Sequence, residues 1–429
     1  MKKKILAGIL CLLMVCQLGI FAFAEDTPQT CTEQVMIQNN NVTSPTNSES
    51  YGITDNGDSV TIENSTITTT VGYGVRAASS TVDVKSSNIS NSASSYSGVL
   101  NNSGSVSVDH STVKTTGNDS YGVNTVYGGT TKITDSTIET TGSESRGVNA
   151  TGNNTYKSTT TITGSTVSSS GDKSYGVYAT GNSTTTITGS TISSSGDESY
   201  GVYANNNSTF LISNSKITAA GTGLYAKESE VTLNNTDINT VNTDGIGVYN
   251  KAEASEYQAN ATSTVTVGGN IKSGGVGVGN DIDASAEQST ATSKTTVTGN
   301  ITATYTGEAT DVLASGYKST AKSTIEITGD VKGNQSGTFD LVEATGDGST
   351  AEATTQITGD VTANNGVAGI VHTTGDGSTA SVTENITGNV TSNSGFGIGV
   401  ESLTLGNAST ATCTVTVDGN ITGTSGIFA

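Results

Sequence analysis

The chain has 429 residues and carries 18 Lys and Arg against 38 Asp and Glu, which gives a formal net charge of −20. So acidic a chain repels nucleic acid and anionic lipid, which argues against a nucleic-acid-binding function. It has 53 Gly and no Trp, a composition that would favour disorder unless the apolar residues recur regularly.

The N-terminal segment, Met1 to Ala24, differs from all the rest. Lys2–Lys4 precede an apolar run over residues 5–23 that only Gln17 interrupts, and Ala22-Phe23-Ala24 follows the small-x-small pattern. This order predicts a secretory signal peptide cleaved after Ala24, and so an extracellular or cell-surface protein. A membrane anchor is the alternative, although the run is short for it. Cleavage removes three lysines and no acid, which leaves 15 basic and 38 acidic residues, or −23.

Residues 25–49 are predicted to form an N-terminal segment or cap. After signal cleavage the chain keeps two cysteines, Cys31 and Cys413, and no apolar run long enough to span a bilayer. A secreted disulfide scaffold would contain many more cysteines. These two lie near opposite ends of the chain, so we expect them not to pair. Cys413 lies two and four residues before Val415 and Val417, and alternate residues of a strand point to the same side. Its side chain should therefore face the core, as theirs should.

From residue 50 onward one pattern recurs: an apolar residue or Thr, a polar residue, Ile or Val, a short polar turn, and another Ile or Val. The copies follow one another at unequal intervals, all within the range of lengths that solenoid repeats show. Fourteen copies are centred on Ile62, Val84, Val108, Ile133, Ile162, Ile187, Ile212, Leu233, Val267, Val297, Ile327, Ile357, Ile386 and Val417.

Each copy consists of short period-2 segments separated by Gly, Asn, Ser and Asp, which is typical of strands and not of helices. A unit of this length holding about three strands is one turn of a parallel β-helix. The sequence therefore predicts an all-β fold: a single long parallel β-solenoid of about fourteen coils. Stacked coils complete one another's core, so each needs only a few inward Val and Ile residues.

Two subfamilies of coil divide the chain at its longest interval, between Leu233 and Val267. The coils in 50–250 are the shorter set, with a typical repeat of about 25 residues, and carry a third strand such as Ser174-Tyr-Gly-Val177. The coils in 251–429 have a longer repeat of about 30 residues and share a Gly-Asn/Asp corner, at Asn270, Asn300, Asp330, Asp360, Asn389 and Asn420. We expect the second set to continue the first in one solenoid; a weak domain boundary near 251–259 is the alternative.

These repeats resemble the right-handed parallel β-helices of bacterial surface adhesins and of the pectin-lyase-like superfamily. The resemblance runs from Tyr51 to the end. The Lys cluster and the short apolar run of residues 1–24 are typical of a bacterial signal peptide. The resemblance implies either of two functions, since that superfamily includes polysaccharide lyases and polygalacturonases as well as non-catalytic adhesins. The adhesin-type members imply a glycan, or a host or cell-envelope surface, as partner.

One tetrapeptide, Asn242-Thr243-Asp244-Gly245, is similar to the polygalacturonase motif whose Asp acts as the acid. The remaining motifs of that family are missing. The only histidines are His110 and His372, and the only arginines are Arg76 and Arg146. The tetrapeptide is therefore interpreted as a variant of the repeat, and no catalytic residue is predicted.

No cofactor is expected either. Ca²⁺ is the one alternative kept open, at the Gly-Asp pairs of Asp172, Asp197, Asp347 and Asp376, although Asp is favoured in such corners for turn reasons alone. The preferred function is a non-catalytic, adhesin-like binding solenoid. A polysaccharide-active lyase or hydrolase with an unrecognised site is the alternative, and ice binding by Thr arrays is a weaker third.

The best candidate for a binding feature is a column of tyrosines in the third strand. The residue after the inward Val or Leu should point outward, and in four consecutive coils it is Tyr178, Tyr203, Tyr225 and Tyr249. Such a column could stack on sugar rings, or it could be a structural ladder in which each ring packs on the next. The unpaired strands of the last coil also suggest end-to-end self-association.

Overall fold

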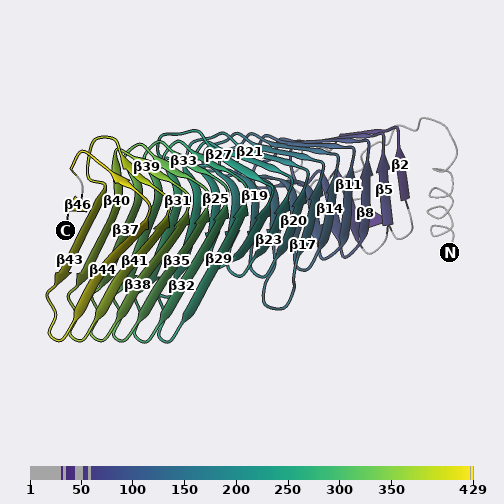
Figure 1. Cartoon of the computed structure of the whole chain (residues 1–429). Helices are drawn as coiled ribbons and strands as arrows, with labels where there is room; N and C mark the ends of the chain where they lie inside the picture. Colours follow the sequence, from purple (N-terminus) through teal and green to yellow (C-terminus); the bar gives the residue numbers. More distant parts are fainter. Residues whose placement is uncertain (1–29, 32–34, 44–51, 57–58, 426, 429) are drawn as a thin grey trace, which may run out of the picture.

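The computed structural model describes residues 30–31, 35–43, 52–56, 59–425 and 427–428 (Figure 1). The predicted signal peptide lies outside these residues. The described residues form 46 strands joined by turns, with no helix among them, so the all-β prediction is confirmed. The strands alternate regularly among three sheets, and every strand pairs in parallel with the strand three places along the chain.

Sheet A carries the third strand of each coil. Its 16 strands are β1 (Thr30–Cys31), β4 (Ile53–Asn56), β7 (Val75–Ala78), β10 (Ser97–Asn102), β13 (Tyr121–Val126), β16 (Arg146–Thr151), β19 (Tyr175–Thr180), β22 (Tyr200–Asn205), β25 (Thr222–Lys227), β28 (Ile246–Glu253), β31 (Val276–Ala284), β34 (Thr306–Ala314), β37 (Ser336–Ala344), β40 (Asn365–Thr373), β43 (Ile398–Thr404) and β46 (Ile427–Phe428).

Sheet B carries the central apolar residues of the repeat. Its 15 strands are β2 (Val35–Gln38), β5 (Ser59–Glu63), β8 (Thr81–Lys85), β11 (Ser105–Asp109), β14 (Thr130–Thr134), β17 (Thr159–Thr163), β20 (Thr184–Thr188), β23 (Thr209–Ser213), β26 (Glu230–Asn234), β29 (Asn260–Gly268), β32 (Thr290–Thr298), β35 (Thr320–Thr328), β38 (Thr350–Thr358), β41 (Thr379–Thr387) and β44 (Thr410–Asp418).

Sheet C follows the polar corner. Its 15 strands are β3 (Asn41–Thr43), β6 (Thr66–Thr69), β9 (Asn88–Asn91), β12 (Thr112–Thr115), β15 (Thr137–Thr140), β18 (Thr166–Ser169), β21 (Thr191–Ser194), β24 (Lys216–Ala219), β27 (Asp237–Thr240), β30 (Ile271–Ser273), β33 (Ile301–Ala303), β36 (Val331–Gly333), β39 (Val361–Ala363), β42 (Val390–Ser392) and β45 (Ile421–Thr422).

The predicted core column is confirmed residue by residue. All fourteen central residues, from Ile62 to Val417, lie in one register column of sheet B. Ile37 of β2 extends that column by one more strand, inside the segment assigned to 25–49. Every member from Ile62 to Ile386 is buried, because each coil covers the next.

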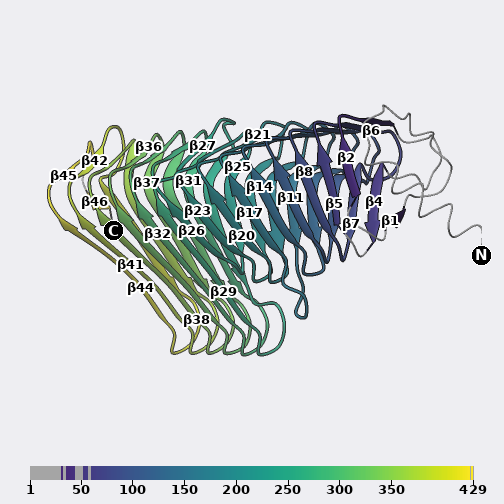
Figure 2. The ribbon, with the colours of Figure 1, turned by 90° about the vertical axis from the view of Figure 1, so that its right-hand side faces the viewer.

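The C-terminal coils are wider than the N-terminal ones. From β28 and β29 onward most strands of sheets A and B reach seven to nine residues, and their far ends project as a wing below the rod (Figure 2). A second apolar cluster fills the wing, built from Ala, Val and Ile side chains such as Ile282, Val312, Ala344 and Val382. All three sheets continue from the short coils to the long ones, because β28 pairs with β31, β26 with β29 and β27 with β30. The two coil types therefore form one rod.

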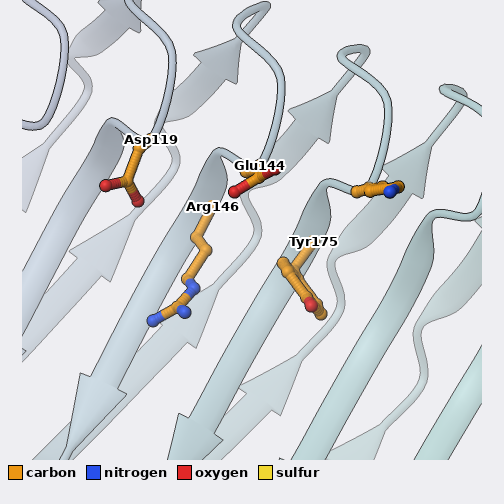
Figure 3. A pocket seen from close by; sticks show the side chains of 5 residues that line it. Asp119, Glu144, Arg146 and Tyr175 are labelled. Atoms are coloured by element: carbon orange, nitrogen blue, oxygen red, sulfur yellow. The ribbon is translucent and has the colours of Figure 1, made fainter.

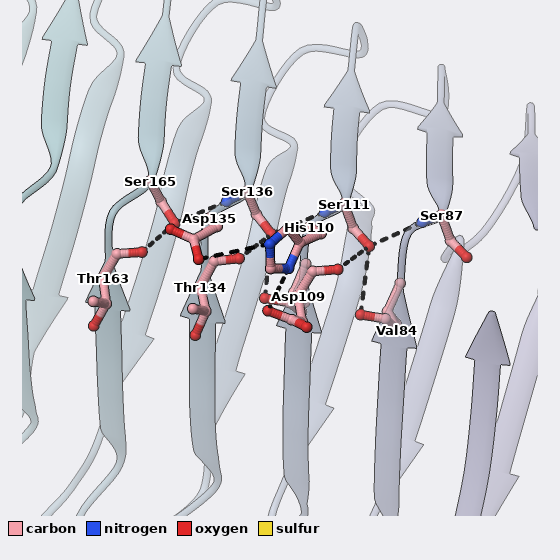
Figure 4. Close-up of polar contacts among 11 residues, drawn as sticks. Val84, Ser87, Asp109, His110, Ser111, Thr134, Asp135, Ser136, Thr163 and Ser165 are labelled. Atoms are coloured by element: carbon pink, nitrogen blue, oxygen red, sulfur yellow. Dashed lines mark hydrogen bonds and ion pairs between the residues drawn. The ribbon is translucent and has the colours of Figure 1, made fainter. Parts of the chain in front are cut away.

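In the N-terminal half, a serine ladder marks the corner between sheets B and C (Figure 4). The Ser111 N–H donates to Ser136 Oγ in the next coil at 3.0 Å, and Ser136 Oγ donates to the Thr134 carbonyl at 2.7 Å. The residue before each serine has a left-handed backbone, with φ of 46° at His110 and 60° at Gly164. Asn and Gly favour this conformation, as the sequence suggested, but His110 shows that the corner also tolerates other residues.

In the C-terminal half the predicted Asn/Asp slot forms its own ladder. Each side-chain oxygen accepts the backbone N–H of the next coil: Asn270 Oδ1 from Asn300 at 3.0 Å, Asn300 Oδ1 from Asp330 at 2.9 Å, and Asp330 Oδ1 from Asp360 at 3.0 Å. These bonds satisfy corner donors that no strand pairs, which explains why Asn and Asp share the slot.

Candidate functional site

The predicted tyrosine column exists on the outer face of sheet A. Tyr178, Tyr203, Tyr225 and Tyr249 lie in one register column and are partly exposed. The Tyr178 and Tyr203 ring centroids are 4.9 Å apart, and those of Tyr203 and Tyr225 are 4.5 Å apart, with 7° between the planes in both pairs. The Tyr249 ring is tilted by 37° from that of Tyr225. Tyr203 is therefore stacked on both sides, as in a structural ladder.

A second column beside the first was missed by the sequence reasoning. Tyr121, Arg146, Tyr175 and Tyr200 are also in register and also face outward. Strict alternation would direct Tyr175 inward, since it stands three residues before Tyr178. Gly176 and Val177 are both buried, however, so the strand changes parity between the two tyrosines.

The parity change depends on glycine. A Cβ at Gly176 would lie 2.6 Å from both the Gly201 carbonyl oxygen and Ile192 Cγ2, so no side chain fits between sheets A and C at this position. The signal was present in the repeated Ser-Tyr-Gly-Val, in which the glycine marks a place of close approach.

The two columns pack in a herringbone. Tyr175 and Tyr200 are nearly parallel, at 5.2 Å and 8°, whereas Tyr175 meets Tyr178 at 79° and Tyr200 meets Tyr203 at 86°. Both offset stacking and edge-to-face contacts are favourable aromatic geometries. The herringbone thus uses ring faces for internal contacts.

Arg146 closes one end of the herringbone. Its guanidinium carbon lies 3.8 Å from the Tyr178 ring centroid and 5.2 Å from that of Tyr121, which are cation–π distances. Its Nη1 donates to Asn149 Oδ1 at 2.8 Å. An open pocket of about 170 Å³ lies beside it (Figure 3), lined by Asp119, Glu144, Arg146, Lys173 and Tyr175. Two carboxylates and two cations thus line the pocket at this end.

Charged residues close the other end. The Tyr249 hydroxyl donates to Asp281 Oδ2 at 2.6 Å, and Lys251 Nζ lies 3.1 Å from the same oxygen. Burial raises the pKa of Tyr225 to about 12, with Lys251 opposing the shift. Burial, and then the bond to Asp281, raises the pKa of Tyr249 above its usual range. Tyr225 and Tyr249 are therefore neutral hydrogen-bonding groups at physiological pH.

The residues weighed for catalysis are not brought together. Asp244 is exposed in the turn between β27 and β28. His110 lies in a corner, 3.0 Å from Asp109 Oδ1, whereas His372 lies on β40 between Glu343 and Glu401, at 3.4 and 3.6 Å. The polygalacturonase-like tetrapeptide thus forms a turn of its own coil.

The four Gly-Asp residues considered for Ca²⁺ occupy exposed corners. Asp172 Oδ1 accepts the Asp197 N–H at 3.1 Å, and Asp347 Oδ1 accepts the Asp376 N–H at 2.9 Å. Within the described ranges, no group of three or more His, Cys, Asp or Glu side chains is placed to hold a metal ion. The same residues contain no helix of the length and apolar character needed to cross a membrane.

Residues 29–192 match the family model described as the right-handed beta helix region. No curated protein matches the sequence. The match covers the N-terminal coils, and the structure carries the same three-sheet coil on to β46. The resemblance found in the repeats is thus confirmed: this chain is a parallel β-solenoid protein whose N-terminal coils are similar to right-handed β-helices.

Proposed function

We propose that the protein is a secreted or cell-surface, non-catalytic β-solenoid of the adhesin type, which binds a glycan or another surface through the outer face of sheet A. The supporting observation is the herringbone of partly exposed tyrosines, capped by Arg146, on an otherwise Thr- and Ser-rich rod. Rigid aromatic rows with polar ends are suited to binding because little side-chain entropy is lost.

The geometry decides which atoms would touch a ligand. Both faces of Tyr203 are occupied by Tyr178 and Tyr225, so a sugar ring cannot lie flat on it. The hydroxyl groups follow the coil spacing, and Arg146 and Lys173 add donors at one end. Binding would therefore use a row of hydrogen bonds, with ring stacking reserved for the ladder itself.

A triple Tyr→Phe variant at Tyr178, Tyr203 and Tyr225 tests this proposal on a glycan array. Phe keeps the stack and removes the hydroxyls, so we expect binding to be lost while the melting temperature changes little. Tyr127, Tyr156 and Tyr257, which are 57%, 54% and 62% exposed outside the ladder, give a matched Phe control. A ladder variant that binds like the wild type would refute the proposed site.

A double alanine variant, Tyr203→Ala with Tyr225→Ala, separates the two roles. If the column is only a ladder, this variant melts earlier and still binds. If the column also binds, the alanine variant melts earlier and no longer binds, whereas the Phe variant loses binding but keeps its melting temperature.

The alternative is a polysaccharide-active enzyme, and the pocket beside Arg146 favours it most. Asp119 and Glu144 lie in successive coils next to two cations, as general acid and base groups could. A lyase and hydrolase panel with Asp119→Asn and Glu144→Gln variants tests this alternative. Cleavage by the wild type that either variant abolishes would replace the binding proposal. Asp244→Asn should leave any activity unchanged.

A further inference from the structure

Three carboxyl groups lie inside the C-terminal coils, at inward positions that hold apolar or neutral polar residues in neighbouring coils. Glu308 on β34, Asp340 on β37 and Glu384 on β41 are all 0% exposed. The buried residues of the described chain include no Lys, Arg or His, so no cation shares the interior with them. A buried carboxylate without a cation is strongly disfavoured.

Each carboxyl accepts a hydrogen bond from a threonine hydroxyl and has one oxygen without a partner. Thr310 donates to Glu308 Oε1 at 2.6 Å, Thr338 donates to Glu384 Oε2 at 2.8 Å, and Thr355 donates to Asp340 Oδ2 at 3.1 Å. Glu308 Oε2, Asp340 Oδ1 and Glu384 Oε1 have no partner. One threonine hydroxyl is too little to solvate a charge, but it suits a neutral acid.

The same interior slot holds a neutral amide two coils earlier. Asn280, Thr310 and Asp340 form one register column, and Thr295 and Thr355 form the facing one together with Ile325. Thr295 donates to Asn280 Oδ1 at 2.8 Å, just as Thr355 donates to Asp340. Asp340 therefore occupies a position that holds Asn in another coil. A protonated Asp has nearly the same shape as Asn and is also neutral, so this position suits the protonated form of Asp340.

The inward-facing groups of the surrounding strands cannot neutralise the carboxyls. The inward positions of β34, β35, β37, β38, β40 and β41 carry apolar residues, Gly, Ser and Thr besides the three acids. β44 contributes the Cys413 thiol, which lies with Glu384 around Gly369. No three His, Cys, Asp or Glu side chains are placed to hold a metal ion in the described part of the chain. Protons are therefore the species that neutralises the three carboxyls.

We propose that the coils from β34 to β44 form a pH-sensitive segment, whose interior stays packed while Glu308, Asp340 and Glu384 are protonated and loosens as the pH rises. Burial raises the pKa of Asp340 to about 7, and burial together with the neighbouring acids raises the pKa values of Glu308 and Glu384 well above their usual range. Unfolded carboxyls titrate near pH 4. The stabilisation is thus complete below about pH 4 and is lost as the pH rises toward 7 and above.

Hydrogen exchange of the whole protein, followed by mass spectrometry and corrected for the intrinsic pH dependence, tests the proposal. Coils β14–β23 of the same molecule, which contain no buried carboxyl, are the internal reference. Between about pH 5 and 7, we expect exchange in β34–β44 to accelerate relative to the reference by about tenfold per pH unit for each ionising carboxyl.

The isosteric variant Glu308→Gln/Asp340→Asn/Glu384→Gln should remove this pH dependence, whereas Glu352→Gln, an outward-facing change on β38, should keep it. Should the triple variant fail to fold, Asp340→Asn alone is expected to make the exchange rate of β34–β44 less dependent on pH, by about tenfold per pH unit. Equal protection of both segments from pH 5 to 9, or a neutral variant with the wild-type slope, would overturn the proposal.

Discussion

Thr236 and Asp237 are adjacent in sequence and accept backbone hydrogen bonds from opposite directions along the rod. The Ser215 N–H, one coil earlier, donates to Thr236 Oγ1 at 3.3 Å, and the Asn270 N–H, one coil later, donates to Asp237 Oδ1 at 2.8 Å. The serine ladder of the N-terminal coils ends at Thr236, and the Asn/Asp ladder of the C-terminal coils begins at Asp237. The junction between the coil types is therefore a reversal of hydrogen-bond direction at one corner.

This junction predicts that Asp237→Ala lowers the melting temperature and Asp237→Asn does not. Alanine removes the acceptor for the Asn270 N–H, whereas Asn keeps an oxygen in the same place. Because Asp237 is exposed, the loss should be about 1 kcal/mol or less. Differential scanning calorimetry of both variants checks this, and equal melting of the two would contradict the role of the oxygen.

The core column predicts a much larger effect. Ile327 is 2% exposed, so Ile327→Asp should cost several kcal/mol through an unpaired buried charge. Asn300→Ala removes only the acceptor for the Asp330 N–H and should cost about 1 kcal/mol. Circular dichroism melts of the two variants give the order. If Ile327→Asp melts with the wild type, the core column is wrongly assigned.

Ultraviolet titration should reveal tyrosines that ionise late. Free tyrosine ionises near pH 10, whereas Tyr225 should ionise only near pH 12. Because folding raises the pKa of Tyr225, its neutral form stabilises the fold fully below about pH 10, and this contribution is lost as the pH rises through 12. A single transition near pH 10 in the native protein would show that packing in the ladder does not raise the pKa of Tyr225.

The Cys413 thiol should react slowly with alkylating reagents at pH 8. It is unpaired and faces the second apolar cluster, as the parity of β44 predicted, although it is only partly buried because β44 has a neighbour on one side only. Burial raises its pKa to about 12, so little thiolate is present. Labelling of native protein is compared with labelling in urea; equal rates would place the thiol outside.

We propose that the chain self-associates at high concentration through the outer edge of β44, the last strand of sheet B in the described part of the chain. This strand carries no charge before Asp418, and its inward Val415 and Val417 are half-buried, which are properties of an unprotected edge. Lysines at the outward positions Thr414 and Thr416 should weaken the association without lowering the melting temperature. Light scattering of both proteins is the measurement, and a wild type that stays monomeric throughout would refute the expectation.

The repeat made much of this fold predictable. Ile62 and its thirteen successors stack because identical slots recur, and the same recurrence placed Tyr178, Tyr203, Tyr225 and Tyr249 in one column. The outward position of Tyr175 and Arg146 was not predicted, because the alternation of inward and outward side chains fails in these strands. At Gly176-Val177, close approach to sheet C buries two successive residues. A rule of simple parity cannot detect such a change within a strand.

The interior acids could not be predicted for a different reason. Residues such as Asp340 are normally solvated, so the sequence pattern suggests an outward position for them. The wider C-terminal coils contain a polar strip between two apolar clusters, in which Asn280, Thr310 and Asp340 follow one another in successive coils. Only the packing of sheet A against sheet B reveals that this strip points inward.

The parallel strand pairing of the three sheets also determines how the rod would respond to force. Their hydrogen bonds run between coils along the rod, so tension between the two ends loads all three sheets together at every coil boundary (Figure 1). Rupture of one boundary would free the contour of a single coil, about 80 Å for a short coil and about 100 Å for a long one. A stretched molecule should therefore lengthen in discrete steps of two sizes, the longer ones coming from the C-terminal half.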